Sequence, residues 1–220
     1  MSWESSALYY ELVNTLVKER LGGLHSAVCV MASVDFAEIE RLQSEGRWDD
    51  AGQLLGDEAA ALERAGAELL VICTNTMHKV APQIQERIRI PLIHIAEATA
   101  DAIVAAGVGT VGLLGTRFTM EEPFYRERLE ARGLQVVLPD ADDRAIVNRV
   151  IYDELVLGEV REESREQYRR VIRDLVSRGA QGVILGCTEI ELLVGADDSP
   201  VPVFPTTTIH ARAAVDAALA

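Results

Sequence analysis

Hydrophobic and polar residues follow two alternating patterns along this chain. Short uninterrupted apolar runs, typical of strands buried on both faces, alternate with longer stretches whose apolar residues recur every three or four positions, as in amphipathic helices. The runs predict strands at 27–34, 69–73, 91–95, 110–114, 136–138, 183–186 and 201–204. The longer stretches predict helices at 5–21, 48–65, 78–87, 96–106, 123–132, 142–157, 164–178 and 209–220. This order predicts an α/β fold with parallel sheets flanked by helices.

One strand pattern occurs twice in the sequence. Aligning Gly66-Ala67 with Gly179-Ala180, an offset of 113 residues (179 − 66), pairs E-L-L-V-I-C-T-N-T with Q-G-V-I-L-G-C-T-E without a gap. A repeat of this length indicates two similar lobes, because solenoid repeats span only about 20 to 50 residues. We expect the first lobe to comprise residues 1–98 with 206–220, and the second residues 99–205.

Small and reactive side chains follow both repeated runs. Cys187, Thr188 and Glu189 come directly after the second run, and the repeat places Thr74 opposite Cys187, whereas Cys73 aligns with a glycine. In open α/β sheets, ligands bind beyond the carboxyl ends of the strands. The sequence therefore predicts a small-molecule site at these two strand ends.

Cys187 is the residue best suited to chemistry there. A free thiol has a pKa of about 8.5, and we expect strand-end amides, a helix N-terminus or nearby cations to lower it. Thr188 and Glu191 have the spacing of a capping box, which predicts a helix start beside the cysteine. The alternative for Cys187 is an inert buried thiol. For Cys73 packing is the better interpretation, and for Thr74 the alternative to catalysis is a helix-capping hydroxyl.

Other kinds of site find little support. Residues 107–112 match G-x-G-x-x-G, but they follow a predicted helix and precede a strand, whereas a dinucleotide site needs the reverse order. His78, His94 and His210 lie in different elements without cysteine or carboxylate partners at metal spacing, so we interpret them as structural. We predict no metal.

Composition narrows the class of protein further. A net charge of −14 and only 21 basic residues, none in a dense run, argue against a nucleic-acid partner. Three cysteines make no disulfide framework, which fits a reducing cytoplasm. The start has no signal-peptide pattern, and no apolar run approaches the roughly 18 residues of a membrane helix. We predict a cytoplasmic protein with no membrane contact.

Several segments resemble one enzyme family. V-I-C-T-N-T-M-H, I-L-G-C-T-E-I, M-S-W-E-S-S, R-L-G-G-L-H-S-A and L-L-G-T-R-F-T-M are similar to segments of the aspartate/glutamate racemases, and the similarity covers essentially the whole chain. The resemblance implies an amino-acid racemase that needs no pyridoxal phosphate or other cofactor, acts on aspartate or glutamate, and forms a homodimer. This chain departs from the family pattern in one place, because Thr74 stands where the family has its first catalytic cysteine.

The resemblance also implies roles for individual residues. Racemisation needs a base on one face of the α-carbon and an acid on the other, and a cleft between two lobes offers that geometry. Thr74 and Cys187 would be the catalytic pair, with Cys187 facing the proton of the favoured L-enantiomer. The substrate contacts implied are Met1, Gln43, Asn75, Thr76, Thr188 and Glu189.

Two other functions and one irregularity remain open at this point. A decarboxylase or cis–trans isomerase of the same superfamily could use the single Cys187, and a two-lobed binding protein could have lost catalysis with the first cysteine. The counterpart of strand 111–115 falls at positions −2 to 2 when the 113-residue offset is subtracted. We therefore expect the first lobe to lack its first strand.

Overall fold

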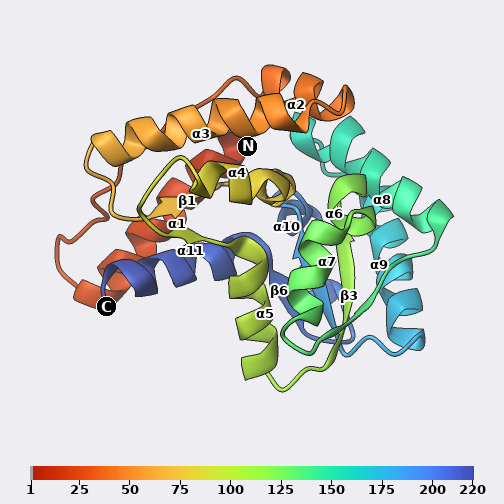
Figure 1. The fold of residues 1–220 in the computed structure, drawn as a ribbon. Coiled ribbons are helices and arrows are strands. Elements are labelled where there is room, and N and C mark those ends of the chain that lie inside the picture. Colours follow the sequence, from red (N-terminus) through yellow and green to blue (C-terminus); the bar gives the residue numbers. More distant parts are fainter. Residues whose placement is uncertain (1) are drawn as a thin grey trace. The chain divides into compact units, whose positions relative to one another are not determined.

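The structure, a computed structural model, describes residues 2–220, which form two compact units (Figure 1). The first unit comprises the described residues up to His94 together with His210–Ala220, and the second is Ile95–Ile209. The chain therefore passes from one unit to the other twice. Each unit contains a parallel sheet and helices that flank it, which confirms the predicted α/β class.

The first unit is mainly helical and has a small sheet. Its helices are α1 (Trp3–Leu21), α2 (Phe36–Ser44), α3 (Trp48–Arg64), the 3₁₀ helix η1 (Thr76–Val80) and α4 (Ala81–Gln85). Strands β1 (Leu70–Val71) and β2 (Leu92–Ile93) pair in parallel, with Leu70 opposite Leu92. The core joins side chains from α2, α3, η1 and α4 to the strand region, as shown by Ile39, Leu55, Met77, Ile84 and Leu70.

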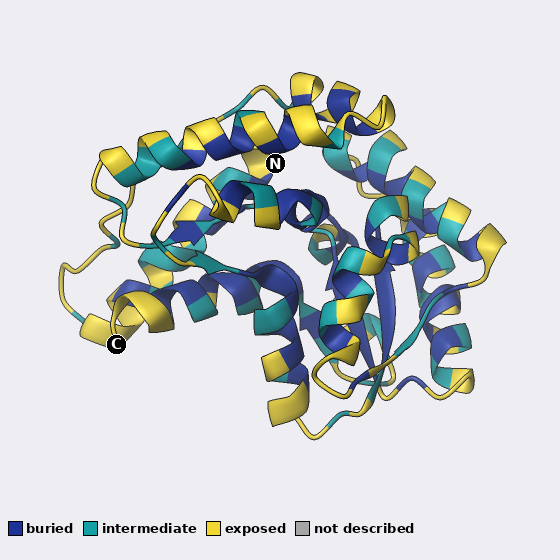
Figure 2. Cartoon of the chain, viewed as in Figure 1, coloured by how far each residue is buried: buried dark blue, intermediate teal, exposed yellow. Residues whose placement is uncertain are grey.

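The strand predicted at 27–34 is absent. Residues 25–35 form neither helix nor strand, and none of them is buried (Figure 2). Leu24 and Val28 are fully exposed. An apolar run forms a strand only when a neighbouring strand pairs its backbone N–H and C=O groups. In the part of the chain that the structure describes, β1 and β2 pair only with each other, so this run has no strand beside it.

The second unit is built on a four-stranded sheet. Strands β3 (Thr110–Gly115), β4 (Gln135–Val137), β5 (Gly182–Gly186) and β6 (Val203–Pro205) are all parallel, in the order β4-β3-β5-β6. The other elements are α5 (Ile95–Ala105), α6 (Arg117–Glu121), α7 (Pro123–Glu130), α8 (Ala141–Asp153), η2 (Leu155–Leu157), α9 (Glu162–Ser177), α10 (Ile190–Leu193) and η3 (Ala196–Asp198). Helix α11 (Thr206–Ala218) begins here, three residues before its predicted start, and continues into the first unit.

Strand β5 is buried on both faces, as its uninterrupted apolar run predicts. Successive side chains of a strand point to opposite faces. Val183 and Leu185 accordingly pack in one cluster with residues of α8 and α9, including Val150 and Tyr168. Ile184 packs in a second cluster with residues of α5 and α7. Two helical layers therefore exclude water from β5, and its carboxyl end leads directly to Cys187, Thr188 and Glu189.

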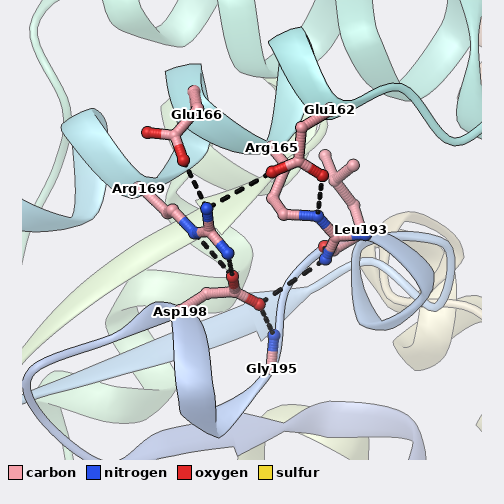
Figure 3. A network of polar contacts seen from close by, with 7 residues as sticks. All are labelled: Glu162, Arg165, Glu166, Arg169, Leu193, Gly195 and Asp198. Carbon is pink, nitrogen blue, oxygen red and sulfur yellow. Dashed lines mark hydrogen bonds and ion pairs between the residues drawn. The ribbon is translucent and has the colours of Figure 1, made fainter.

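An ion-pair network holds the segment that follows α10 (Figure 3). Asp198 accepts hydrogen bonds from the backbone N–H of Gly195 (2.9 Å) and from Nε of Arg169 (2.7 Å). Burial by itself would raise the pKa of Asp198, but these bonds and the Arg169 charge outweigh it and lower that pKa. Arg165 of α9 donates to the carbonyl oxygen of Leu193 at the end of α10. Helix α9 is therefore bonded to the C-terminal end of α10, the end farther along the chain from Cys187.

Two glycines allow β3 and β5 to approach closely where both strands end. Gly115 and Gly186 are register partners. A Cβ atom added to Gly186 would lie 2.6 Å from the carbonyl oxygen of Leu114, closer than any side-chain carbon tolerates. Because Cys187 is the next residue, this close contact between the two strands fixes the backbone position from which the Cys187 side chain extends.

We expect Gly186→Ala to lower the free energy of unfolding by about 1 to 3 kcal/mol, because the added methyl group must push β3 and β5 apart. Denaturant unfolding of the purified protein measures the effect. Gly195→Ala is the matched control, since a Cβ there meets nothing within 4 Å and its φ of −142° suits any residue. Equal stability of both variants would contradict the close approach.

Candidate active site

In the first unit, residues 72–75 connect β1 to η1. Buried side chains from outside this turn hold two successive carbonyl groups. Oγ of Ser5, on α1, donates to the carbonyl oxygen of Cys73 (2.9 Å), and Nδ1 of His78 lies 2.7 Å from the carbonyl oxygen of Thr74. Since a carbonyl oxygen only accepts, Nδ1 of His78 carries the ring proton. The path of the turn is therefore fixed from α1 and from η1.

His78 belongs to a group of three packed histidines. Its ring centroid lies 4.5 Å from that of His94 and 5.5 Å from that of His210. The hydroxyl of Tyr9 bonds to Nδ1 of His210 (2.7 Å), whose Nε2 lies 2.7 Å from the carbonyl oxygen of Ile93. Burial lowers the pKa of His78 far below its ordinary value and that of His210 to about 4. Both rings are therefore neutral near pH 7.

Among the described residues, no group of three or more histidine, cysteine, aspartate or glutamate side chains is arranged to hold a metal ion.

The substrate contacts expected in the first unit gather around η1. Asn75 and Thr76 are buried at its start. Gln43 of α2 is buried as well, and its amide Nε2 donates to Sδ of Met77 at 2.9 Å. Met1 lies outside the described residues. Three of the four residues expected in this unit are therefore brought to one short helix.

The two candidate residues of the repeat differ in what they can do here. Cys73 and Thr74 are both partly buried. Burial raises the pKa of the Cys73 thiol to about 11, so this thiol keeps its proton near pH 7. In this unit Thr74 stands beside the amide and hydroxyl groups of Asn75 and Thr76, which can bind an anion without ionising.

In the second unit, Cys187 follows β5 and donates its thiol proton to a carboxylate. Its Sγ lies 2.9 Å from Oε2 of Glu189. Burial raises the pKa of the Cys187 thiol well above its ordinary value, and the negative charge of Glu189 raises it further. The sequence-based expectation of a lowered thiol pKa is therefore wrong, because the nearest charged group is an anion and not a cation. A protonated thiol next to a carboxylate base is the resting arrangement.

The capping box predicted from Thr188 and Glu191 is also wrong. The carboxylate of Glu191 accepts instead from the backbone N–H of Thr207 (3.2 Å), which comes from the first turn of α11. The hydroxyl of Thr207 in turn donates to Oγ1 of Thr188 (3.1 Å). Burial raises the pKa of Glu191 to about 7, although its bonds to Thr207 oppose the shift.

Sequence reasoning missed Glu191 and Thr207 as members of this cluster. The run Thr206–Thr208 at the end of the last predicted strand was a visible signal, because short polar residues commonly occupy such positions. However, Thr206 pairs with Leu185, 21 residues away, and Thr207 pairs with Glu191, 16 residues away. Only tertiary folding could reveal these pairs.

Within the described residues, no helix has both the length and the hydropathy needed to cross a membrane.

Each unit thus carries a polar cluster at the end of a parallel strand. The first offers amide and hydroxyl groups, and the second a thiol hydrogen-bonded to a carboxylate. Comparison with known proteins identifies the class of this two-unit α/β protein as amino-acid racemase. Residues 1–214 match the model of the Asp/Glu/hydantoin racemase family. The chain belongs to this family.

Solved structures agree with the family assignment. A protein from Yersinia pestis classed with the Asp/Glu racemases is 57% identical, with a TM-score of 0.94 over 100% of this chain and 96% of that one. An aspartate racemase homologue from Pyrococcus horikoshii is 35% identical, with a TM-score of 0.86 over 99% and 95% of the two chains.

Curated relatives are more distant in sequence. The broad specificity amino-acid racemase RacX of Bacillus subtilis is 24% identical over 176 residues, which cover 78% of this chain and 74% of that protein. The glutamate racemase of Deinococcus radiodurans is 28% identical over 67% of this chain, but only 51% of its own length is matched. The family and these relatives make the chain an isomerase of the racemase type.

We expect Glu191→Gln to stabilise the protein at high pH. The folded state raises the pKa of Glu191 from an ordinary 4.5 to about 7, so folding favours the protonated form. This contribution is complete below pH 4.5 and is lost as the pH rises to 7. A neutral glutamine still accepts from Thr207, so the variant should gain on the order of 1 to 2 kcal/mol at pH 8 and almost nothing at pH 4.5. Paired denaturation curves at both pH values measure this, and a gain independent of pH would contradict it.

We expect Glu189→Gln to make Cys187 more reactive, because losing the adjacent negative charge lowers the thiol pKa. The rate of Cys187 alkylation by iodoacetamide at pH 8 should rise roughly tenfold or more, in proportion to the thiolate fraction. Peptide mass spectrometry follows each cysteine separately. Cys29, which is exposed, serves as the internal control and should react equally in both proteins. An unchanged Cys187 rate would show that Glu189 does not hold the thiol proton.

Proposed function

We propose that the protein racemises aspartate or glutamate without pyridoxal phosphate, with Cys187 and Thr74 serving opposite faces of the substrate α-carbon. The observation that carries this proposal is the 2.9 Å contact between Sγ of Cys187 and Oε2 of Glu189 at the end of a buried strand, in a chain of the racemase family. A thiol and a carboxylate base in contact can take up and give back a proton, which is what racemisation requires.

The proposed reaction begins at Cys187. The carboxylate of Glu189 takes the thiol proton, and the thiolate removes the α-proton of the L-enantiomer. The electron pair left on the α-carbon delocalises into the substrate carboxylate group. A proton supplied at Thr74 then adds to the opposite face. Solvent returns a proton to Thr74, and Glu189 releases to solvent the proton that it took from the thiol, so both units regain their starting protonation states. One proton leaves and one returns, so no cofactor enters the balance.

The substrate carboxylate is assigned to Asn75, Thr76 and Thr188, whose amide and hydroxyl groups stabilise the developing charge without competing as bases. Gln43 and Met1 are assigned as further contacts, following the family resemblance. Glu189 has a double assignment, as a substrate contact and as the acceptor of the Cys187 proton. Which acidic amino acid is preferred is part of the test below.

The two directions of the reaction are expected to differ in rate. A threonine hydroxyl is a far weaker acid than a thiol, and it needs outside activation before it can act as a base. Cys187 should therefore abstract protons much faster than the group on the other face. Because the resemblance assigns the L-enantiomer to Cys187, we propose a preference for L-substrates.

Two further parts of the proposal concern the protein in the cell. Homodimer formation follows from the family resemblance. A cytoplasmic location follows from cysteine usage, because Cys29, Cys73 and Cys187 are all free thiols.

We expect the protein in heavy water to exchange the α-proton of L-aspartate or L-glutamate for deuterium at least tenfold faster than that of the D-enantiomer. Proton NMR of each enantiomer measures both rates. Cys187→Ala should abolish exchange from the L-enantiomer, whereas Cys73→Ala, the matched control, should retain it. Thr74→Cys should narrow the difference between enantiomers.

Other results of the exchange experiment would contradict the proposed function or the proposed asymmetry between enantiomers. Release of carbon dioxide without exchange would indicate a decarboxylase, which could use a single cysteine. Tight binding of the amino acid without exchange would indicate a binding protein. Equal exchange from both enantiomers would contradict the assigned asymmetry.

A further inference from the structure

Thr207 makes a contact that the racemase reaction as described does not use. It is the second residue of α11 and is fully buried. Its Oγ1 donates to Oγ1 of Thr188 at 3.1 Å, although the two residues are 19 positions apart. Thr188 lies between Cys187 and Glu189, so this bond reaches the middle of the reactive loop.

The direction of this bond decides what Thr188 can do. A hydroxyl group has one proton and two acceptor sites. When Thr207 donates, the Thr188 oxygen accepts, and Thr188 keeps its own proton for a different acceptor. A β-branched side chain has few χ1 states, so fixing one direction at the Thr188 oxygen also restricts where its proton can point.

Thr207 is itself held in place from two sides. Its backbone N–H donates to the carboxylate of Glu191 on α10 at 3.2 Å. The preceding residue, Thr206, is also fully buried, and its Oγ1 donates to the carbonyl oxygen of Leu185 at 2.9 Å. The start of α11 is therefore bonded both to the end of β5 and to α10. These contacts fix the backbone from which the Thr207 side chain extends, and that side chain places its Oγ1 3.1 Å from Oγ1 of Thr188.

We infer that Thr207 is a positioning residue that orients the Thr188 hydroxyl toward the substrate carboxylate. The inference rests on the proposed function, in which Thr188 binds that carboxylate. Thr207 does not touch the substrate and acts only through Thr188. Its loss should therefore weaken substrate binding and leave the chemistry at Cys187 largely intact.

The test is a kinetic comparison of Thr207→Val with the unchanged protein. α-Deuterium exchange from L-aspartate and L-glutamate in heavy water gives KM and kcat for each variant. Thr207→Val keeps the backbone N–H that Glu191 accepts and removes only the hydroxyl. We expect KM to rise roughly tenfold while kcat changes less than threefold. Thr207→Ser restores a hydroxyl and should bring KM back to within about threefold of the original value.

A double-mutant cycle with Thr188→Val shows whether Thr207 acts through Thr188. In the Thr188→Val background, Thr207→Val should change KM by less than twofold, because the group it orients is already gone. If Thr207→Val does not fold, Thr207→Ala carries the same cycle without placing a methyl group against Thr188. Independent, additive effects on KM would overturn the inference.

Thr99→Val is the matched structural control. Thr99 is a fully buried threonine of the same unit, and its hydroxyl donates to the carbonyl oxygen of Ile95 at 2.7 Å. This variant should lose stability and keep its KM. An unchanged KM in Thr207→Val, in an active protein, would refute the positioning role alone. Absence of α-exchange in the unchanged protein would refute the proposed function instead.

Discussion

Buried carbonyl groups at the carboxyl ends of the parallel strands need hydrogen-bond partners, and this constraint shapes both polar clusters of the protein. Buried side chains satisfy them in each unit. Ser5 and His78 donate to the carbonyl groups that follow β1, and Thr206 donates to a carbonyl group near the end of β5. An unpaired buried carbonyl group is costly, so these bonds are required for folding as well as for shaping the turns. The groups that position reactive residues are therefore part of the scaffold.

The charge state of the buried titratable groups also follows from their removal from water. The chain carries a net charge of −14, yet His78 and His210 are neutral and the Cys73 and Cys187 thiols are protonated. Burial disfavours the charged form of every titratable group, and only a close opposite charge or several hydrogen bonds can reverse this. Cys187 has an anion beside it, so in the proposed reaction its activation depends on passing the proton to Glu189. In that reaction the thiolate forms only transiently.

Much of the second unit was predictable from the order of apolar residues. Uninterrupted runs at 110–114 and 183–186 correspond to β3 and β5, and the glycine-rich segment 107–112 does follow a helix and run into a strand. Local periodicity was sufficient because each of these strands has partners on both sides. The run at 27–34 has the same apolar character, but it forms no strand because no neighbour pairs with it. Strand formation depends on a partner that local sequence does not specify.

The sequence by itself determined the α/β class, the two strand ends that carry polar residues and the identity of the candidate side chains, because these depend on residue type and local spacing. Tertiary structure alone decided which groups surround them. It buried the Cys187 thiol and placed the carboxylate of Glu189 beside it. Both effects raise the pKa of the thiol, whereas the sequence led us to expect a lowered thiol pKa. It also gave Glu191 a partner on α11 in place of its neighbour in the chain. Hydrogen bonds and desolvation act through space, so the chemistry of Cys187 depends on the fold that buries its thiol and turns the side chain of Glu189, two residues along the chain, toward it.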